Sequence, residues 1–418
     1  MEKKKAIILI LGVVIVVLIA FFFFYFRTNI NTGTPTNSNG EQTQTGFGNT
    51  SQDKTGATSS NGFGNTETPA STTNTNITTK LRLKKVFQEP VAGAVIFGNI
   101  PNEKIRLVER SNGNVQEISF DSNQITRITN TTIPKIYEAL WDKIGTNVLL
   151  RYIKEETDKI ETYSAKVTLS TSASNESTGI ISGSFFPENI KTITVNKGSS
   201  KVFYLLESGS GSVGYTSNID GAQKKQVLTS PTKNWNASWV GNNSVSLITK
   251  PSYNLQGFLF LLNTTNESLE KILGKMYGLT ALFESNGESV LYSQNIRSKP
   301  TLGYYDIQGD INSSLSLSTF ADKCVWSKIN SNIIYCAVPK NIPNGLYPDS
   351  WYNGTVSFSD DLWKINTEDK TTTLLYQTKD NENIDASDLI VSSKDNYIIF
   401  TNKKDLSLWS FEISPATN

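Results

Sequence analysis

Few residue types in this 418-residue chain could support chemistry. The chain has no histidine, which excludes Ser-His-Asp and Cys-His catalysis, imidazole metal sites and the usual near-neutral proton shuttle. Its two cysteines are too few for a zinc cluster or an iron–sulfur site. We therefore expect no metal and no cofactor, and any catalysis would have to use carboxylates.

The two cysteines, Cys324 and Cys336, are symmetric about Asn330 in a predicted hairpin. A tight turn at Asn330 would place them opposite each other on antiparallel strands, where Cα atoms are about 4.5–5.5 Å apart. This spacing predicts a disulfide that closes a short loop. The alternative is a pair of buried free thiols.

A long insertion from Ala337 to Asp360 follows this hairpin and holds the best candidate for a binding site. Exposed aromatic side chains and a carboxylate on a proline-stiffened loop suit the recognition of a protein or a glycan. The alternative is that the loop folds over the domain and buries its own aromatic side chains. The candidate binding residues are Tyr347, Asp349, Trp351 and Tyr352.

Adjacent carboxylates occur at Asp360-Asp361 and at Glu155-Glu156. Neighbouring side chains on a strand point to opposite faces, so neither pair can act as a two-carboxylate catalyst by itself, and we expect solvated surface charges. A glycan-cleaving enzyme would need two acidic residues from different repeats about 5–10 Å apart. The net charge of +1 argues against a nucleic-acid partner.

The elements that must position these residues recur along the chain from Leu81 onward. Each unit has an apolar or Trp-led strand, a turn of Gly, Asn or Asp, and a second strand of Val, Ile or Leu. The turns fall near positions 98, 145, 198, 242, 287, 331 and 395. Four antiparallel strands in each interval of about 45–50 residues is the period of a β-propeller blade.

Seven copies predict an all-β, seven-bladed β-propeller over residues 81–418, although six or eight blades also fit. The last copy has only three strands before the chain ends, so we expect Arg82–Gln88 to supply the fourth and close the ring. The alternative is a set of β-sandwich domains. The fixed spacing of the turns and the repeated placement of Trp141, Trp239 and Trp326 favour the propeller. One short stretch, Glu267–Leu273, is expected to be helical.

Three of the turns carry a resemblance to known propellers. The segments Phe283–Gly287, Trp141–Gly145 and Val391–Asp395 resemble degenerate forms of the Ser-Pro-Asp-Gly strand-turn of WD40-like and TolB-like propellers. The resemblance covers the whole domain and is one of fold. TolB-like propellers are envelope proteins that bind protein partners, so the resemblance implies a binding role in the cell envelope.

Residues 6–26 form an uncharged apolar run. As a helix it would be about 32 Å long, close to the ~30 Å hydrocarbon core of a bilayer. Lysines at positions 3–5 precede it, so the positive-inside rule places the N-terminus in the cytoplasm and the rest outside. The alternative, a cleaved signal peptide, would have a shorter apolar region. We expect residues 1–27 to be a single-pass signal anchor.

Residues 28–80 are rich in Thr, Asn, Gly and Ser and poor in large apolar side chains. Such a segment cannot bury enough apolar surface to offset its ordering entropy, which predicts a disordered linker. These features together predict a membrane-tethered, extracytoplasmic propeller that acts as a protein-binding or scaffold module of the cell envelope. Its partner would be an envelope protein or a surface glycan. The alternative function is a carboxylate-dependent glycan-binding or glycan-cleaving enzyme, and the sequence favours binding over catalysis.

Overall fold

The computed structural model describes residues 81–413, except for 121, 131, 156, 169–178, 197 and 199. The predicted anchor at 6–26 and the predicted linker at 28–80 lie outside this part of the chain. Among the residues that are described, no helix is both long enough and apolar enough to cross a bilayer.

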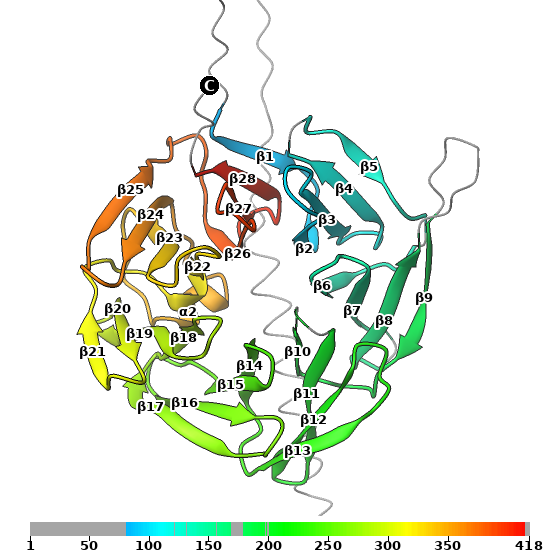
Figure 1. Cartoon of the computed structure of the whole chain (residues 1–418), viewed down its shortest axis with the longest axis horizontal. Coiled ribbons are helices and arrows are strands. Elements are labelled where there is room, and N and C mark those ends of the chain that lie inside the picture. The colour runs from blue at the N-terminus through cyan, green and yellow to red at the C-terminus, as the bar shows by residue number, and fades with distance from the viewer. Residues whose placement is uncertain are drawn as a thin grey trace, which may run out of the picture. The chain divides into compact units, whose positions relative to one another are not determined.

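Seven antiparallel sheets of four strands each form a closed ring, shown in Figure 1. Blades 1 to 6 use four consecutive strands each, ordered from the inner edge of the ring to the outer edge, and blade 7 combines the last three strands with the first one. The seven-bladed prediction is therefore confirmed. Every predicted turn falls between the first and second strands of its blade.

Each blade has four strand positions, from innermost to outermost, and the strands at each position run in order from blade 1 to blade 7. The innermost strands are β2 (Val91–Phe97), β6 (Ile136–Trp141), β10 (Thr192–Asn196), β14 (Trp235–Val240), β18 (Thr280–Phe283), β22 (Cys324–Trp326) and β26 (Ala386–Val391). The second strands are β3 (Lys104–Glu109), β7 (Asn147–Ile153), β11 (Lys201–Ser208), β15 (Ser244–Thr249), β19 (Ser289–Ile296), β23 (Ile333–Pro339) and β27 (Tyr397–Asn402). The third strands are β4 (Val115–Ser119), β8 (Ile160–Thr168), β12 (Gly211–Asn218), β16 (Gln256–Asn263), β20 (Lys299–Asp306), β24 (Asp360–Asn366) and β28 (Leu408–Glu412). The outermost strands are β5 (Ile125–Arg127), β9 (Ile180–Phe185), β13 (Lys225–Ser230), β17 (Leu269–Tyr277), β21 (Ile311–Ser314), β25 (Thr372–Tyr376) and β1 (Leu83–Phe87).

Two short helical turns complete the described elements, η1 (Ala321–Lys323) and α2 (Asp349–Tyr352). The helix predicted at Glu267–Leu273 is wrong, because this stretch opens β17 and pairs with β16. A helix here would lose the backbone hydrogen bonds between β16 and β17. Strand pairing therefore outweighs the helical tendency of this stretch.

The repeated inner-strand tryptophans join neighbouring blades. Each indole N–H donates a hydrogen bond to a backbone carbonyl on the inner strand of the preceding blade and so links the two sheets. The bonds are Trp141 to Gly93 (3.3 Å), Trp239 to Thr194 (3.1 Å) and Trp326 to Leu282 (3.2 Å). The recurring tryptophans that favoured a propeller in the sequence thus make the same contact three times, between blades 1 and 2, 3 and 4, and 5 and 6.

The turns that resemble the propeller strand-turn are closed by side chains of the residue that follows the inner strand. Asp142 Oδ1 accepts the backbone N–H of Thr146 at 2.9 Å, and Ser392 Oγ accepts that of Tyr397 at 3.0 Å. A short polar side chain that bonds the backbone in this way favours a tight turn over a longer loop. The turns after β6 and β26 are therefore closed by local hydrogen bonds.

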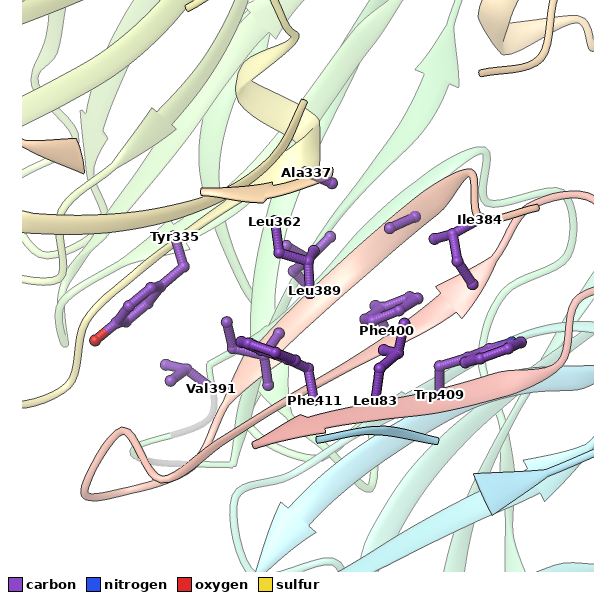
Figure 2. Close-up of a cluster of buried hydrophobic side chains, with 12 residues drawn as sticks. Leu83, Tyr335, Ala337, Leu362, Ile384, Leu389, Val391, Phe400, Trp409 and Phe411 are labelled. Carbon is purple, nitrogen blue, oxygen red and sulfur yellow. The ribbon is translucent and has the colours of Figure 1, made fainter. Parts of the chain in front are cut away.

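The start of the domain closes the ring, as predicted. Strand β1 pairs with β28, with Leu83 opposite Phe411. Figure 2 shows Leu83 among the buried side chains between blades 6 and 7, near Phe400 and Trp409. One polypeptide segment from each end of the domain therefore builds blade 7.

Arg82 fastens this closing strand. Its Nε and Nη2 atoms donate to the carbonyl oxygens of Glu412 (3.1 Å) and Ile413 (2.7 Å) at the end of β28. Its Nη1 atom donates to the carbonyl of Leu375 (3.2 Å) on β25 of blade 6. The guanidinium also lies 4.9 Å from the centre of the Phe411 ring. A single side chain therefore links β1, its own blade and the neighbouring blade.

Cys324 and Cys336 form the predicted disulfide between β22 and β23. Their Cα atoms are 4.1 Å apart, the two residues are paired in register, and both are buried. The alternative of two free thiols is thereby excluded for this structure.

Loss of this disulfide should lower the stability of the domain. With a sequence separation of 12, the loop-entropy estimate is about 3 kcal/mol or less. We expect a Cys324→Ala/Cys336→Ala variant to lose up to about 3 kcal/mol in denaturant unfolding, and a reducing agent to cause a similar loss in the wild type. Unchanged stability of the wild type in the reducing agent would contradict this prediction.

Candidate functional site

The candidate binding loop is a folded insertion on one face of the ring. It occupies residues 340–359, between β23 and β24, a shorter stretch than predicted because β23 continues to Pro339. This face also carries the other turns between second and third strands and the connections between blades, and we call it the insertion face. Figure 1 shows α2, the helical turn of the insertion, at the inner edge of the ring.

The insertion has an aromatic core of its own. Tyr347 and Trp351 are buried with Phe320 and Phe358, and the rings of Phe320 and Trp351 stack at 5.2 Å between centroids. The exposure that we expected for Tyr347 and Trp351 is therefore wrong. The alternative, a loop that folds over the ring and buries its aromatic side chains, describes the structure, because burial of large aromatic surfaces is strongly favourable.

Asp349 and Tyr352 are partly exposed and connect the insertion to the ring. Asp349 Oδ2 accepts the backbone N–H of Tyr253, in the β15–β16 turn of blade 4, at 2.6 Å. The Tyr352 hydroxyl donates to the Asp322 carboxylate in η1. Burial, and then the Asp322 carboxylate, raises the pKa of Tyr352 well above its ordinary value of 10, so this hydroxyl stays protonated. Both residues thus hold the shape of the insertion.

A buried ion cluster lies beneath the insertion, at the boundary of blades 6 and 7. Lys323 Nζ is 2.6 Å from Asp385 Oδ1, 2.8 Å from Asp360 Oδ2 and 2.9 Å from the carbonyl oxygen of Ala386. The three charged side chains are at most 1% exposed. The ammonium also lies 4.7 Å from the centre of a Trp351 ring, within range of a cation–π interaction.

Asp385 is the carboxylate that anchors the insertion. It accepts the indole N–H of Trp351 (3.0 Å), the backbone N–H of Phe358 (3.0 Å) and the hydroxyl of Ser357 (2.9 Å). Burial acts to raise the pKa of Asp385, but the Lys323 charge and these hydrogen bonds lower it overall. An ionised Asp385 therefore holds both ends of the aromatic core in place.

Asp360 also pairs with the Lys323 ammonium, but it has fewer hydrogen-bond partners than Asp385. Its Oδ2 atom accepts the backbone N–H of Ala386 at 2.7 Å, whereas its buried Oδ1 atom has no hydrogen-bond partner among the described residues. Burial raises the pKa of Asp360 to about 6, against the effect of Lys323. The expectation that Asp360 is a solvated surface charge is wrong, because β24 directs this side chain into the cluster.

Asp360 and Asp385 are two acids from different blades that converge, as a carboxylate enzyme would require. They converge on Lys323 within the protein core, where a substrate cannot reach them. In the part of the chain described by the structure, no three Cys, Asp or Glu side chains are grouped so that they could hold a metal ion.

The raised pKa of Asp360 makes the stability of the domain depend on pH. A native Asp360 with a pKa of about 6 binds its proton more tightly than the unfolded residue, whose ordinary pKa is 3.8. The native state is therefore favoured at low pH, and about 2 kcal/mol of this contribution is lost as the pH rises from 4 to 7. The pKa of Asp385 is lowered, so its contribution to stability is lost only at lower pH, when the carboxylate becomes protonated.

Denaturant unfolding of the wild type and of Asp360→Asn at pH 4, 5, 6 and 7 isolates this effect. The asparagine does not titrate, so the stability of the wild type relative to the variant should fall by about 2 kcal/mol between pH 4 and pH 7. A constant difference across this range would contradict the assignment.

One cavity of the described ring, of about 860 Å³, lies at the inner edge of blades 1, 2, 3 and 7, and we call it the axial cavity. Its lining includes residues of the inner strands β2, β6, β10 and β26, together with residues of β7, β8, β27 and β28. No described residue of the inner strands of blades 4 to 6, where the insertion is attached, contributes to its wall. The sequence did not indicate this cavity, because its lining residues come from four separate repeats.

The sequence matches no protein-family model and no curated protein. Solved structures do match. An oligogalacturonate lyase from Vibrio parahaemolyticus aligns over 82% of this chain and 96% of its own, with 10% sequence identity and a TM-score of 0.52. TolB from Acinetobacter baumannii aligns over 67% of this chain, with 12% identity and a TM-score of 0.41, and the chain spans 62% of that protein's length. The alignment with the lyase supports the overall fold of this chain and nothing beyond the fold.

Proposed function

We propose that this protein is a membrane-tethered, extracytoplasmic β-propeller that binds a protein partner of the cell envelope through its insertion face. Residues 6–26 would anchor the chain and residues 28–80 would tether the ring at a distance from the bilayer. The Cys324–Cys336 disulfide supports an extracytoplasmic location, because such bonds persist in oxidising compartments.

The observation that carries the proposal is a group of exposed apolar side chains on the insertion face of blades 4 and 5. Leu346 of the insertion is 54% exposed and Leu255 of the β15–β16 turn is 64% exposed. Tyr277 and Ile296, at the ends of β17 and β19, are also exposed. Large apolar side chains that gather on one face of a folded domain are typical of a surface that binds another protein.

The loops that carry these side chains are tied to one another. The Asn295 side chain donates to the carbonyl of Tyr347 at 3.3 Å, and the backbone N–H of Gly278 donates to the carbonyl of Ser252 at 2.9 Å. Together with the Asp349–Tyr253 bond, these contacts join the insertion to blades 4 and 5. A surface that is already ordered loses less entropy on binding.

Site-specific photo-cross-linking in cells tests this proposal. A cross-linking residue in place of Leu346 should capture a protein partner, whereas one in place of Leu374, a leucine 43% exposed on outer strand β25, should not. Equal capture from the two positions, or none from Leu346, would overturn the proposed binding face.

The location is tested separately with alkaline phosphatase, an enzyme that is active only after export, fused to the C-terminus. We expect activity from the full chain and none from a chain that lacks residues 6–26. An inactive full-length fusion would overturn the proposed topology.

A further inference from the structure

Three inner strands of the ring are interrupted by β-bulges at the end nearest the insertion face. The extra residue is Ala92 in β2, Tyr137 in β6, and one of the pair Asp388 and Leu389 in β26. These strands belong to three consecutive blades, 7, 1 and 2. The inner strands of blades 3 to 6 pair with their neighbours without a shift in register. Bulges redirect side chains and leave backbone groups unpaired, and they are common beside binding sites.

The bulged residues line one wall of the axial cavity, whose volume of about 860 Å³ is within the range of ligand pockets. Much of the remaining wall is aliphatic, with Ala94, Leu140 and Val195 as examples. The cavity thus combines an apolar interior with a polar rim where the bulges occur.

Arg110 supplies the uncompensated positive charge of this rim. It lines both the axial cavity and an adjoining cavity of about 680 Å³. Its Nη1 atom donates to the carbonyl of the bulged Tyr137 at 3.2 Å, and it forms no ion pair with any residue that the structure describes. The half-buried guanidinium is therefore held in position, with donors left over for a ligand.

The other cations of the rim are already neutralised. Arg151 pairs with Glu138 and donates to the carbonyl of Ile190 at 2.5 Å. Lys191 pairs with Glu207 at 2.5 Å. The Arg151 Nε atom is buried without a hydrogen-bond partner among the described residues, so even this paired arginine keeps one unused donor.

We propose that the axial cavity binds a peptide segment in which one carboxylate, from a side chain or a C-terminus, pairs with Arg110 while a neighbouring aliphatic residue enters the apolar interior. A polyuronate would bring several negative charges close to Glu138 and Asp388, which line the same cavity. A peptide with a single carboxylate avoids this repulsion and matches the aliphatic wall. This inference rests on the proposed function, since it names the chemistry of the bound partner.

Fluorescent hexapeptides of Leu, Val and Ala with one central Asp, or with Asn in its place, test the proposal on the full chain in detergent. Matched pairs with a free or an amidated C-terminus distinguish the two sources of the carboxylate. We expect a carboxylate to strengthen binding at least tenfold, and Arg110→Gln to remove this preference while the Asn peptide binds as before. Arg297→Gln, an exposed arginine on the insertion face of blade 5, should leave the preference unchanged.

A second variant tests the position of the peptide without changing any charge. Ala92→Leu would fill the cavity at the β2 bulge and should weaken all peptides at least tenfold, with the unfolding midpoint measured to confirm that the ring is intact. Equal affinity for charged and neutral peptides, a preference that survives Arg110→Gln, or binding of uronate oligomers alone would overturn the proposal. If Leu346 still captures a protein in cells, such a result overturns this inference and leaves the proposed function in place.

Discussion

Replacing Lys323 with methionine is expected to lower the free energy of unfolding by about 3–5 kcal/mol, the usual cost of breaking a buried ion pair. Methionine keeps a long apolar side chain but removes the ammonium that lies between Asp360 and Asp385. The two carboxylates would then repel each other in the core. Denaturant unfolding measures the loss, and faster proteolysis within residues 340–359 would show that the insertion has been released, because Asp385 holds Trp351 and Phe358.

Two further variants show whether the charge is responsible. A triple variant, Lys323→Met with Asp360→Asn and Asp385→Asn, removes all three charges and should recover at least half of the lost stability. Lys340→Met is the matched control, since Lys340 is in the insertion and pairs with Asp361 at 3.7 Å but is 23% exposed. We expect it to cost less than about 1 kcal/mol. Equal losses from Lys323→Met and Lys340→Met would show that the cluster does not anchor the insertion.

The repeat architecture could be predicted from sequence because each blade needs a tight turn between its first and second strands. A turn that starts with a residue such as Asp142 or Ser327 is closed by hydrogen bonds within a few positions, so its signal is local. The disulfide was predictable for the same reason, since Cys324 and Cys336 belong to one hairpin. The closing strand followed from counting strands in the last repeat.

The candidate site was less predictable because its contacts join distant segments. Asp385 lies 62 positions from Lys323, and no local pattern connects them. One signal was available: Asp322 and Lys323 interrupt an otherwise apolar segment, and charged residues in such a segment suggest buried partners. The three bulges had no sequence signal, because a bulge depends on the register of two paired strands.

The burial of Tyr347 and Trp351 shows how composition alone misplaces a loop. Aromatic residues with prolines and a carboxylate are common in recognition loops, but the same residues suit a small core. The choice between them depended on Phe320 and Phe358, which complete that core from outside α2. The exposed Leu346, one residue before the buried Tyr347, is the better candidate for contact with a partner.

Deleting residues 81–88 is expected to have a still larger effect than the loss of Lys323, namely loss of cooperative folding. The deletion removes Leu83, Val86 and Phe87, all buried, and burial of three such side chains is worth about 5–9 kcal/mol. This is comparable with the whole stability of a typical domain, about 5–15 kcal/mol. It would also expose the paired edge of β28 and remove the three hydrogen bonds of Arg82.

A matched deletion of eight residues in the predicted linker, 60–67, should leave thermal unfolding unchanged, since it keeps β1. Arg82→Ala should be intermediate, with a loss of about 1–3 kcal/mol, because it removes three partly buried hydrogen bonds but keeps the strand. A synthetic peptide of residues 81–88 added to the deleted chain should restore a cooperative transition, since β28 would again have its partner. If the chain without 81–88 unfolds at the wild-type temperature, β1 is dispensable, and the ring must be held closed by the contacts between the inner strands of blades 7 and 1 instead.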